Sequence, residues 1–579
     1  MKINGATYQL LLIGILSGWG SCELKAQTPF DREYREVAAQ IQERVNLFSD
    51  RSLYAVGETI HFIADLRLTG PVAEYGWSSV LYVELIASNG KPLVQGKYPI
   101  SGGKAEGELH IPAESVTGDY YLKAYTRWMR NQGPGSYSYT ALKIINPFRS
   151  EVVEHEDHEV PSSRMQKAVY REGILECSTA SASYRPGEEV LLDLKGSSGT
   201  DFGQLNCCVT VVPEGTIDLS GHSFVPVPHQ EEDSFRVRFL PDLGRTVSIS
   251  GTVVDSAQAP VPYATLHFSQ LGASPDFFAA MADEQGRFVL NAPAGAGETQ
   301  EFFVTPEQDV GEGREVRIDE EFDSRTSDFP GEPFSLSEDE KERARLISLN
   351  MQLSKVFMPG LVTAAAEEVE IIPEGKRVPF YGTRVNRLLI DDYVRLPNLE
   401  EVFINLVPEI QFYKKKGVDR IRILSDNSSI EVYSPLIMVD HVSVFDHEAL
   451  LALSPDKIER IDLINEIYLK GNVAFGGVLA IHSRKGDMAG IDLPKGSYFF
   501  DYQYFRPEPG PVDPMPDLDV RVPDTRNTLL WTSGLNLEKD TGKELSFRAP
   551  ERAGNYVILV RGILPSGEPY MASSRFRVE

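Results

Sequence analysis

The stretch 434–484 places the tightest constraint on the fold, because turns divide it into three short β-rich pieces. Leu436–Val439 is a continuous apolar run, typical of a strand buried on both faces. Pro455 ends one element and opens another, since proline fixes its own φ and keeps its predecessor out of the helical region. Gly476 and Gly477 let the next strand start from a backbone position that tolerates positive φ. We therefore expect a small α+β unit here.

This stretch resembles the plug domain of TonB-dependent outer-membrane receptors. The matching residues are Pro435, Asp440, Pro455, Ile458, Glu459, Ile461, Gly477, Val478 and Ile481, with Gly476 beside them. The family usually follows the aspartate with glycine, where this sequence has His441. The resemblance implies a plug-like domain over 380–486.

The plug-like domain is expected to stand without a barrel. Receptor plugs lie inside a barrel of about 22 strands, whereas 485–579 shows no series of tilted, outward-apolar spans. Its apolar strands must then be buried against each other and against a helix expected near 398–407. A domain of this size can support its own core.

An internal repeat predicts two related β-sandwiches, at 45–148 and 170–245. Tyr54, Gly57 and Glu58, followed by alternating apolar residues, recur with equal spacing as Tyr184, Gly187 and Glu188. Alternation after a turn glycine is typical of half-buried strands. Both segments resemble macroglobulin-type domains of the α2-macroglobulin superfamily. No cysteine here has the Cys-Gly-Glu-Gln thioester context, so the resemblance implies the fold without the protease-trapping activity.

A third β-sandwich is predicted over 247–306. Alternating strands precede Pro260 and Pro262, and an Asp-x-x-Gly turn ends at Gly286. The segment resembles carboxypeptidase-regulatory-like domains, which are non-catalytic, prealbumin-like and often precede a receptor plug. Together, these domains resemble exported proteins of the Bacteroidetes. The predicted fold class is multi-domain and mainly β, with tandem macroglobulin- or immunoglobulin-like and prealbumin-like sandwiches plus an α+β plug-like domain.

Several shorter segments complete the predicted organisation. The region 335–358 is a helical connector, because Ser337 and Glu340 form a capping box and apolar residues recur on one face. The region 507–523 is a proline-rich linker, and 525–579 is a separate C-terminal sandwich-like segment. Near the start, the four-residue spacing of Val37, Ile41 and Val45 predicts a short amphipathic helix within 30–46.

Residues 1–26 are predicted to be a signal peptide. Lys2 supplies a positive start, a short apolar core follows, and Ala26 is the small residue that signal peptidase needs. A second interpretation makes Cys22 a lipidated N-terminus. No later stretch is apolar for long enough to form a transmembrane helix. The mature chain is therefore expected to be exported, to the periplasm or the outer membrane, either soluble or anchored by lipid.

Three cysteines remain after cleavage at Ala26. Export permits a disulfide, and adjacent strand residues point to opposite faces, so Cys177 can meet only one of Cys207 and Cys208. Three buried free thiols are the other interpretation. For metals, His155 and His158 lie in a charged linker, and His229 with Glu232 lacks the surroundings of a carboxypeptidase zinc site. We expect no metal and no cofactor.

The composition narrows the function classes. A net charge of −27 argues against nucleic acid and anionic lipid as partners. The sequence contains no Gly-x-Ser-x-Gly motif, P-loop or dinucleotide fingerprint. We therefore expect a non-catalytic interaction protein, an accessory of an outer-membrane transport or secretion complex. One alternative is a separate plug that closes a pore encoded by another chain. Another is a surface adhesin or glycan-binding protein.

Overall fold

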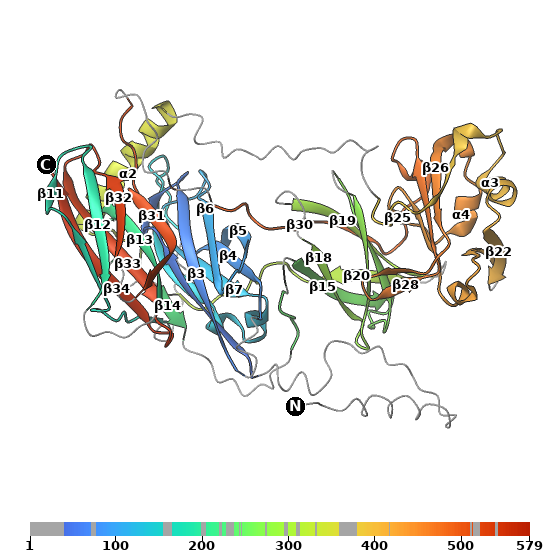
Figure 1. The fold of residues 1–579 in the computed structure, drawn as a ribbon, viewed down its shortest axis with the longest axis horizontal. Helices are drawn as coiled ribbons and strands as arrows, with labels where there is room; N and C mark the ends of the chain where they lie inside the picture. The colour runs from blue at the N-terminus through green and yellow to red at the C-terminus, as the bar shows by residue number, and fades with distance from the viewer. Residues whose placement is uncertain are drawn as a thin grey trace, which may run out of the picture.

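A computed structural model describes residues 40–70, 77–153, 165–197, 204–218, 223–226, 237–242, 244, 246–272, 275–293, 299–308, 313–329, 333–357, 379–415, 417–509, 512, 522–538 and 542–579. The molecule is a row of four units (Figure 1). Along its long axis come the second sandwich, the first sandwich, the third sandwich and the plug-like unit. The predicted fold class, multi-domain and mainly β with tandem sandwiches, is confirmed.

The first sandwich is built from two sheets that enclose an aromatic-rich core. One sheet contains β1 (Gln42–Ser49), β3 (Thr59–Thr69) and β6 (Lys104–His110). The other runs β5 (Pro92–Pro99), β4 (Val80–Ala87), β7 (Gly118–Thr126), β8 (Ser138–Ile145), β14 (Ser223–Pro226) and β9 (Met165–Lys167), with β2 (Leu53–Ala55) parallel to β8. The helix expected within 30–46 is wrong from Gln42 onward, because β1 pairs with β3 along its whole length and burial alternates along it. Residues 1–39, including Cys22, lie outside the described residues.

The second sandwich corrects two predicted boundaries. One sheet orders β11 (Ser183–Tyr184), β34 (Pro569–Val578), β33 (Gly554–Ile563), β13 (Gln204–Pro213) and β31 (Leu530–Glu538). The other orders β10 (Leu175–Thr179), β12 (Glu189–Gly196) and β32 (Lys543–Arg548). The segments 170–245 and 525–579, predicted as separate sandwiches, thus form one domain. The colours of Figure 1 show this mixing directly, since strands from the early and the late segment lie side by side in both sheets.

The third sandwich is also completed from a distant part of the chain. One sheet orders β18 (Arg287–Pro293), β15 (Thr246–Asp255) and β20 (Arg314–Ile318). The other orders β17 (Asp276–Met281), β16 (Thr265–Gln270), β19 (Thr299–Pro306) and β30 (Tyr498–Gln503). The predicted range 247–306 therefore stops short. Strand β20 follows it, and β30 joins β19 only after the chain has built the plug-like unit.

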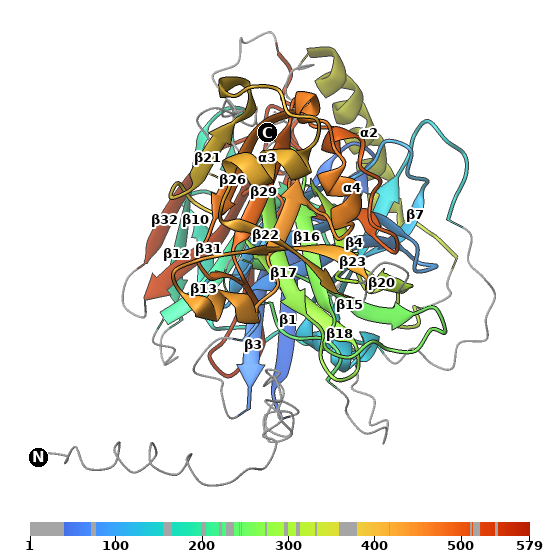
Figure 2. The same cartoon turned by 90° about the vertical axis from the view of Figure 1, so that its right-hand side faces the viewer.

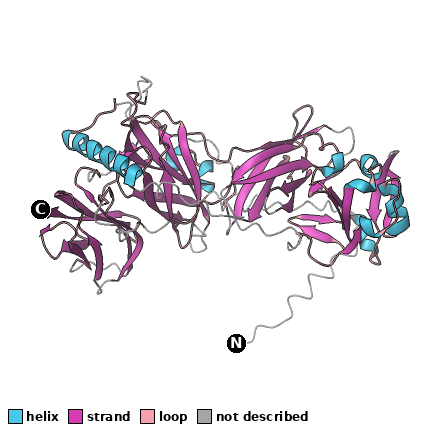
Figure 3. Cartoon of the chain, turned by 90° about the horizontal axis from the view of Figure 1, so that it is seen from above, coloured by secondary structure: helices cyan, strands magenta, loops and turns pink. Residues whose placement is uncertain are grey.

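The plug-like unit holds a five-stranded sheet with small helices on one face. The order is β21 (Asn386–Leu389), β26 (Ile458–Ile464), β29 (Val478–Ser483), β24 (Leu436–Val439) and β25 (Val442–Ser443). Two hairpins are added, β22 (Ile410–Lys415) with β23 (Val418–Ile423) and β27 (Tyr468–Lys470) with β28 (Val473–Phe475). Helices α3 (Leu399–Leu406) and α4 (His447–Leu451) cover the sheet, and Figures 2 and 3 show them gathered at this end of the molecule.

The opposite face of this sheet is covered by the third sandwich. Leu436 and Met438 of β24 and Val478 of β29 share one core cluster with Phe277 and Ala279 of β17. The expectation that 380–486 is self-sufficient is therefore incomplete, because residues outside that range pack against one face of its sheet.

Helix α2 (Glu338–Phe357) packs on the first sandwich, with Ile347 and Met351 in its core. The predicted capping box is confirmed: the Ser337 N–H donates to Glu340 Oε2 at 2.8 Å, and the Glu340 N–H donates to Ser337 Oγ at 3.2 Å. None of the described helices is both long and apolar enough to cross a membrane.

Candidate functional site

Asp440, the aspartate of the plug-like motif, joins the C-terminal ends of the neighbouring strands β24 and β29. Asp440 Oδ1 accepts from the Ser483 N–H at 2.8 Å, while Oδ2 accepts from Ser483 Oγ at 2.5 Å and from the Met488 N–H at 2.8 Å. Asp440 and His441 both adopt left-handed backbone, with φ of 47° and 69°. Glycine would take the second position without steric cost, whereas this chain has His441 there.

The glycine pair of the motif is required by close backbone packing. A Cβ at Gly476 would lie 2.3 Å from the Tyr433 carbonyl oxygen, and one at Gly477 would lie 2.5 Å from that of Ile464. Gly477 also has φ of 91°. These glycines therefore fix how β29 enters the sheet, which is a structural role.

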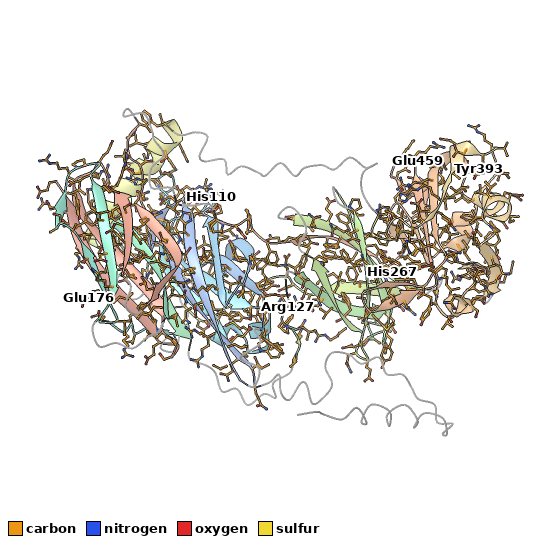
Figure 4. The ribbon with its side chains drawn as sticks, in the orientation of Figure 1. His110, Arg127, Glu176, His267, Tyr393 and Glu459 are labelled. Carbon is orange, nitrogen blue, oxygen red and sulfur yellow. The ribbon has the colours of Figure 1, made fainter. Side chains whose placement is uncertain are left out.

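The remaining motif residues do not gather into one site. Pro435 is half-buried before β24, and Pro455 is buried at the start of a short 3₁₀ turn. Glu459 is exposed on β26 at the far end of the molecule (Figure 4). The motif as a whole thus positions the sheet and its loops.

The junction with the third sandwich contains a serine–histidine pair. His267 Nδ1 lies 2.7 Å from Ser443 Oγ, and the ring is 4% exposed between Phe277 and Phe475. Burial lowers the pKa of His267 to about 3, so the imidazole is neutral. Because Ser443 is only 1% exposed, a substrate cannot reach it in this arrangement. The pair joins two domains.

The plug-like unit has an accessible cleft of about 290 Å³ at its distal end, named here the distal cleft. Its apolar lining comes from Ile390, Tyr393, Val394, Leu396, Val402 and Leu406. Val394 is 83% exposed and Tyr393 is 47% exposed, and Figure 4 shows Tyr393 at the tip of the unit. Exposed apolar groups beside a concavity are typical of binding sites.

Two ion pairs complete the distal cleft. Arg484 forms a fork with Asp391, with N–O distances of 3.0 and 2.5 Å, and Arg395 Nε lies 3.3 Å from Asp456 Oδ1. The charges balance, so the cleft offers polar partners without a strong field of either sign. It could hold an apolar side chain of a partner while these groups bind the neighbouring backbone.

This cleft was not predicted from the sequence. Its lining residues between Asp391 and Leu396 lie just after β21. A signal was available: Tyr393 and Val394 follow two aspartates immediately after the strand, where a turn should be polar. Apolar residues at a solvent-facing turn are a sign of a contact surface.

Whether Cys177 forms a disulfide stays a prediction, but the structure favours one of its two possible partners. The three cysteines that the structure describes are unbonded. Cys207 belongs to the core of the second sandwich with Cys177 packed against it, whereas Cys208 points into a cluster with Phe48 and Ile63 of the first sandwich. Any bridge should therefore join Cys177 to Cys207, which peptide mapping under non-reducing conditions will test. Burial raises the pKa of both thiols to about 12.

Two histidine-containing segments singled out in the sequence cannot be placed. His155 with His158, and His229 with Glu232, lie outside the described residues. Within the described ranges, no group of three or more histidine, cysteine, aspartate or glutamate side chains is arranged to hold a metal ion.

Comparison with known proteins gives distant structural neighbours. No family model matches the sequence, and no curated protein matches it. Salmonella alpha-2-macroglobulin reacted with methylamine is 10% identical, with 93% of this chain and 39% of that chain covered and a TM-score of 0.22. Native Escherichia coli alpha-2-macroglobulin is also 10% identical, with 93% of this chain and 40% of that chain covered and a TM-score of 0.22. The Yersinia pseudotuberculosis adhesin InvE is 14% identical, with 47% of this chain and 57% of that chain covered and a TM-score of 0.12.

This chain spans about two-fifths of the length of the two macroglobulins.

Proposed function

We propose that this chain is a non-catalytic, exported interaction protein whose distal cleft contacts a protein of an outer-membrane complex. The observation that carries the proposal is the exposed pair Tyr393 and Val394 on the rim of the cleft, at the end of the molecule farthest from the second sandwich. The outer-membrane setting rests on the resemblance of 380–486 to receptor plugs. The predicted signal peptide 1–26 supports export, to the periplasm or the outer membrane.

The arrangement of the four units in a row supports a role in which the two ends of the molecule contact different partners. Each unit is joined to its neighbour by buried side chains, as in the contact of Arg127 Nη1 with the Ser248 carbonyl at 2.9 Å. The second sandwich and the distal cleft thus lie at opposite ends of a linked row (Figure 1). Such a row can hold one partner at a distance from another.

The two alternatives receive less support. A separate plug would place its sheet inside a barrel wall, whereas the third sandwich already occupies one face of this sheet. A glycan-binding protein needs exposed aromatic platforms. Of the tryptophans that the structure describes, Trp128 is buried and its ring lies 5.4 Å from that of Trp77, edge to face, and Trp531 is half-buried.

Co-purification tests the proposal with a matched pair of variants. Val394 and Val169, which lies between β9 and β10, are 83% and 86% exposed, so a lysine at either position should leave folding unchanged. Affinity-tagged protein from its native cells should lose outer-membrane partners on Val394→Lys and keep them on Val169→Lys. Equal recovery of the same partners with both variants would refute the distal cleft as the contact.

A further inference from the structure

Among the strands that the structure describes, β30 pairs only with β19, which makes it an edge strand. It is also the last strand added to the third sandwich, after the chain has returned from the plug-like unit. Its residues, Tyr498 to Gln503, contain no proline, lysine or bulge, which are common protections of a sheet edge. The open side of β30 is therefore a candidate for pairing with another strand.

Hydrogen bonds at Gln503 show which backbone groups face outward. Its N–H donates to Glu321 Oε1 at 3.0 Å, and its carbonyl accepts from Lys97 Nζ at 3.0 Å, so neither group points to β19. Backbone groups alternate along an antiparallel strand. The N–H and C=O groups of Phe499 and Asp501 therefore also point away from β19, and no described residue hydrogen-bonds to them on that side.

The side chains of Phe499 and Asp501 indicate which kind of side chain a neighbouring strand would need. Phe499 is 53% exposed and lies opposite the buried Phe303. Asp501 is exposed and lies directly opposite Glu301, which is also exposed. Two carboxylates in a directly opposed pair repel each other, and no described lysine or arginine forms an ion pair with either. A cation placed beside Asp501 would relieve this repulsion.

We infer that the open edge of β30 binds an extended segment of a partner protein as an added antiparallel strand. The segment carries a lysine or arginine beside Asp501 and Glu301, and an apolar residue two positions along, beside Phe499. The backbone groups of Phe499 and Asp501 bind the segment's main chain, and these side chains select among segments. This surface is separate from the distal cleft, and the inference does not depend on that cleft.

The test uses the full chain and a fluorescent capped peptide, Thr-Lys-Val-Ile-Val-Thr, in which lysine and isoleucine share one face. Fluorescence anisotropy at low ionic strength should show saturable binding. The same peptide with glutamate for lysine should bind at least tenfold more weakly, and the peptide N-methylated along its backbone should not bind. Hydrogen exchange should show the Phe499 and Asp501 amides protected only in the complex.

Three variants locate the site. Phe499→Pro removes an outward N–H without removing a ladder hydrogen bond, and it should abolish binding. Asp501→Lys should reverse the preference between the lysine and glutamate peptides. Val394→Lys in the distal cleft should bind like the unchanged chain. An unchanged chain that binds neither peptide, or binds the glutamate peptide equally well, would overturn the inference and leave Asp501 as a charge that blocks edge pairing.

Discussion

Tyr184 and Phe576 pack edge to face in the core of the second sandwich, with ring centroids 5.8 Å apart. One residue comes from the first half of this domain and the other from the last strand of the chain. Between the two halves the chain builds the third sandwich, helix α2 and the plug-like unit. The plug-like unit is itself enclosed between β20 and β30 of the third sandwich, so one insertion lies inside another.

The split second sandwich should unfold as one unit. Leu192 of β12 and Ile558 of β33 are both fully buried in its core, so Leu192→Ala and Ile558→Ala should each cost about 2–5 kcal/mol. Hydrogen exchange should show that each variant lowers the protection of β12 and β33 alike. Val169→Ala, at an 86% exposed position, is the control. Loss of protection in β33 alone with Ile558→Ala would show two independent domains.

The internal repeat shows how far the sequence could predict this fold. The Ala55 N–H donates to Glu58 Oε2 at 2.6 Å, and the Arg185 N–H donates to Glu188 Oε2 at 2.7 Å. The repeated residues thus make the same turn in both sandwiches, because the contact is local.

A second repeated feature, a tyrosine whose hydroxyl closes a local loop, links the first sandwich with the last segment of the chain. Tyr120 donates to the Val116 carbonyl at 2.7 Å, and Tyr556 donates to the Arg552 carbonyl at 2.8 Å, so each tyrosine closes a loop four residues back. The two lie in β7 and β33, which belong to the first and the second sandwich. The sequence pattern showed that 525–579 was sandwich-like, but pairing across an insertion depends on tertiary contacts that no local pattern encodes.

The same limit explains the other differences. Val45 fits a helical spacing, yet pairing of β1 with β3 decides its conformation. The distal cleft was not predicted because Tyr393 and Val394 meet Val402 and Leu406 only after the chain has folded back through α3. The helix starting after Asn398 was predictable, since its side chain accepts from the Glu401 N–H at 2.9 Å in an ordinary cap.

Removing the third sandwich should destabilise the plug-like unit. A fragment of 380–486 would expose Leu436, Met438 and Phe475, which pack against Phe277 and Ala279. We expect this fragment to bind an apolar dye and to be cut rapidly by protease, whereas a fragment of 246–509 should resist. If the shorter fragment is as resistant as the longer one, the contact with the third sandwich is dispensable.

Asp440→Ala should destabilise the same unit by about 2–4 kcal/mol, because three hydrogen bonds to one carboxylate are lost. Asp440→Asn should lose less stability than the alanine variant, since the amide oxygen can still accept from a backbone N–H. Urea unfolding followed by hydrogen exchange of β29 measures both. Unchanged protection of β29 in the alanine variant would contradict the role given to this residue.

Acid should loosen the junction between the third sandwich and the plug-like unit. Burial lowers the pKa of His267 from 6.5 to about 3, and lowers those of His447 and His482 to about 4. The unfolded chain binds these protons first, so the stability that is present above pH 6.5 is lost as pH falls toward the folded pKa values. His267 alone should contribute a slope of about 1.4 kcal/mol per pH unit between roughly pH 6 and 4.

Urea unfolding at a series of pH values checks this slope. His267→Asn should flatten it by that amount, whereas His110→Gln, at an exposed position of the first sandwich, should leave it unchanged. An identical slope in the His267 variant would show that this histidine is not buried as a neutral group.

Site-specific photocrosslinking in the native cells tests the central claim most directly. A photoreactive amino acid replaces Val394 on the rim of the distal cleft in one strain, and Val169 in the segment between β9 and β10 in another. We expect position 394 to crosslink to one defined outer-membrane protein. Position 169 should give no such crosslink, and unlabelled chain should compete with the crosslink from position 394. Crosslinks to that protein from both positions at equal yield, or none from position 394 while position 169 gives them, would contradict it.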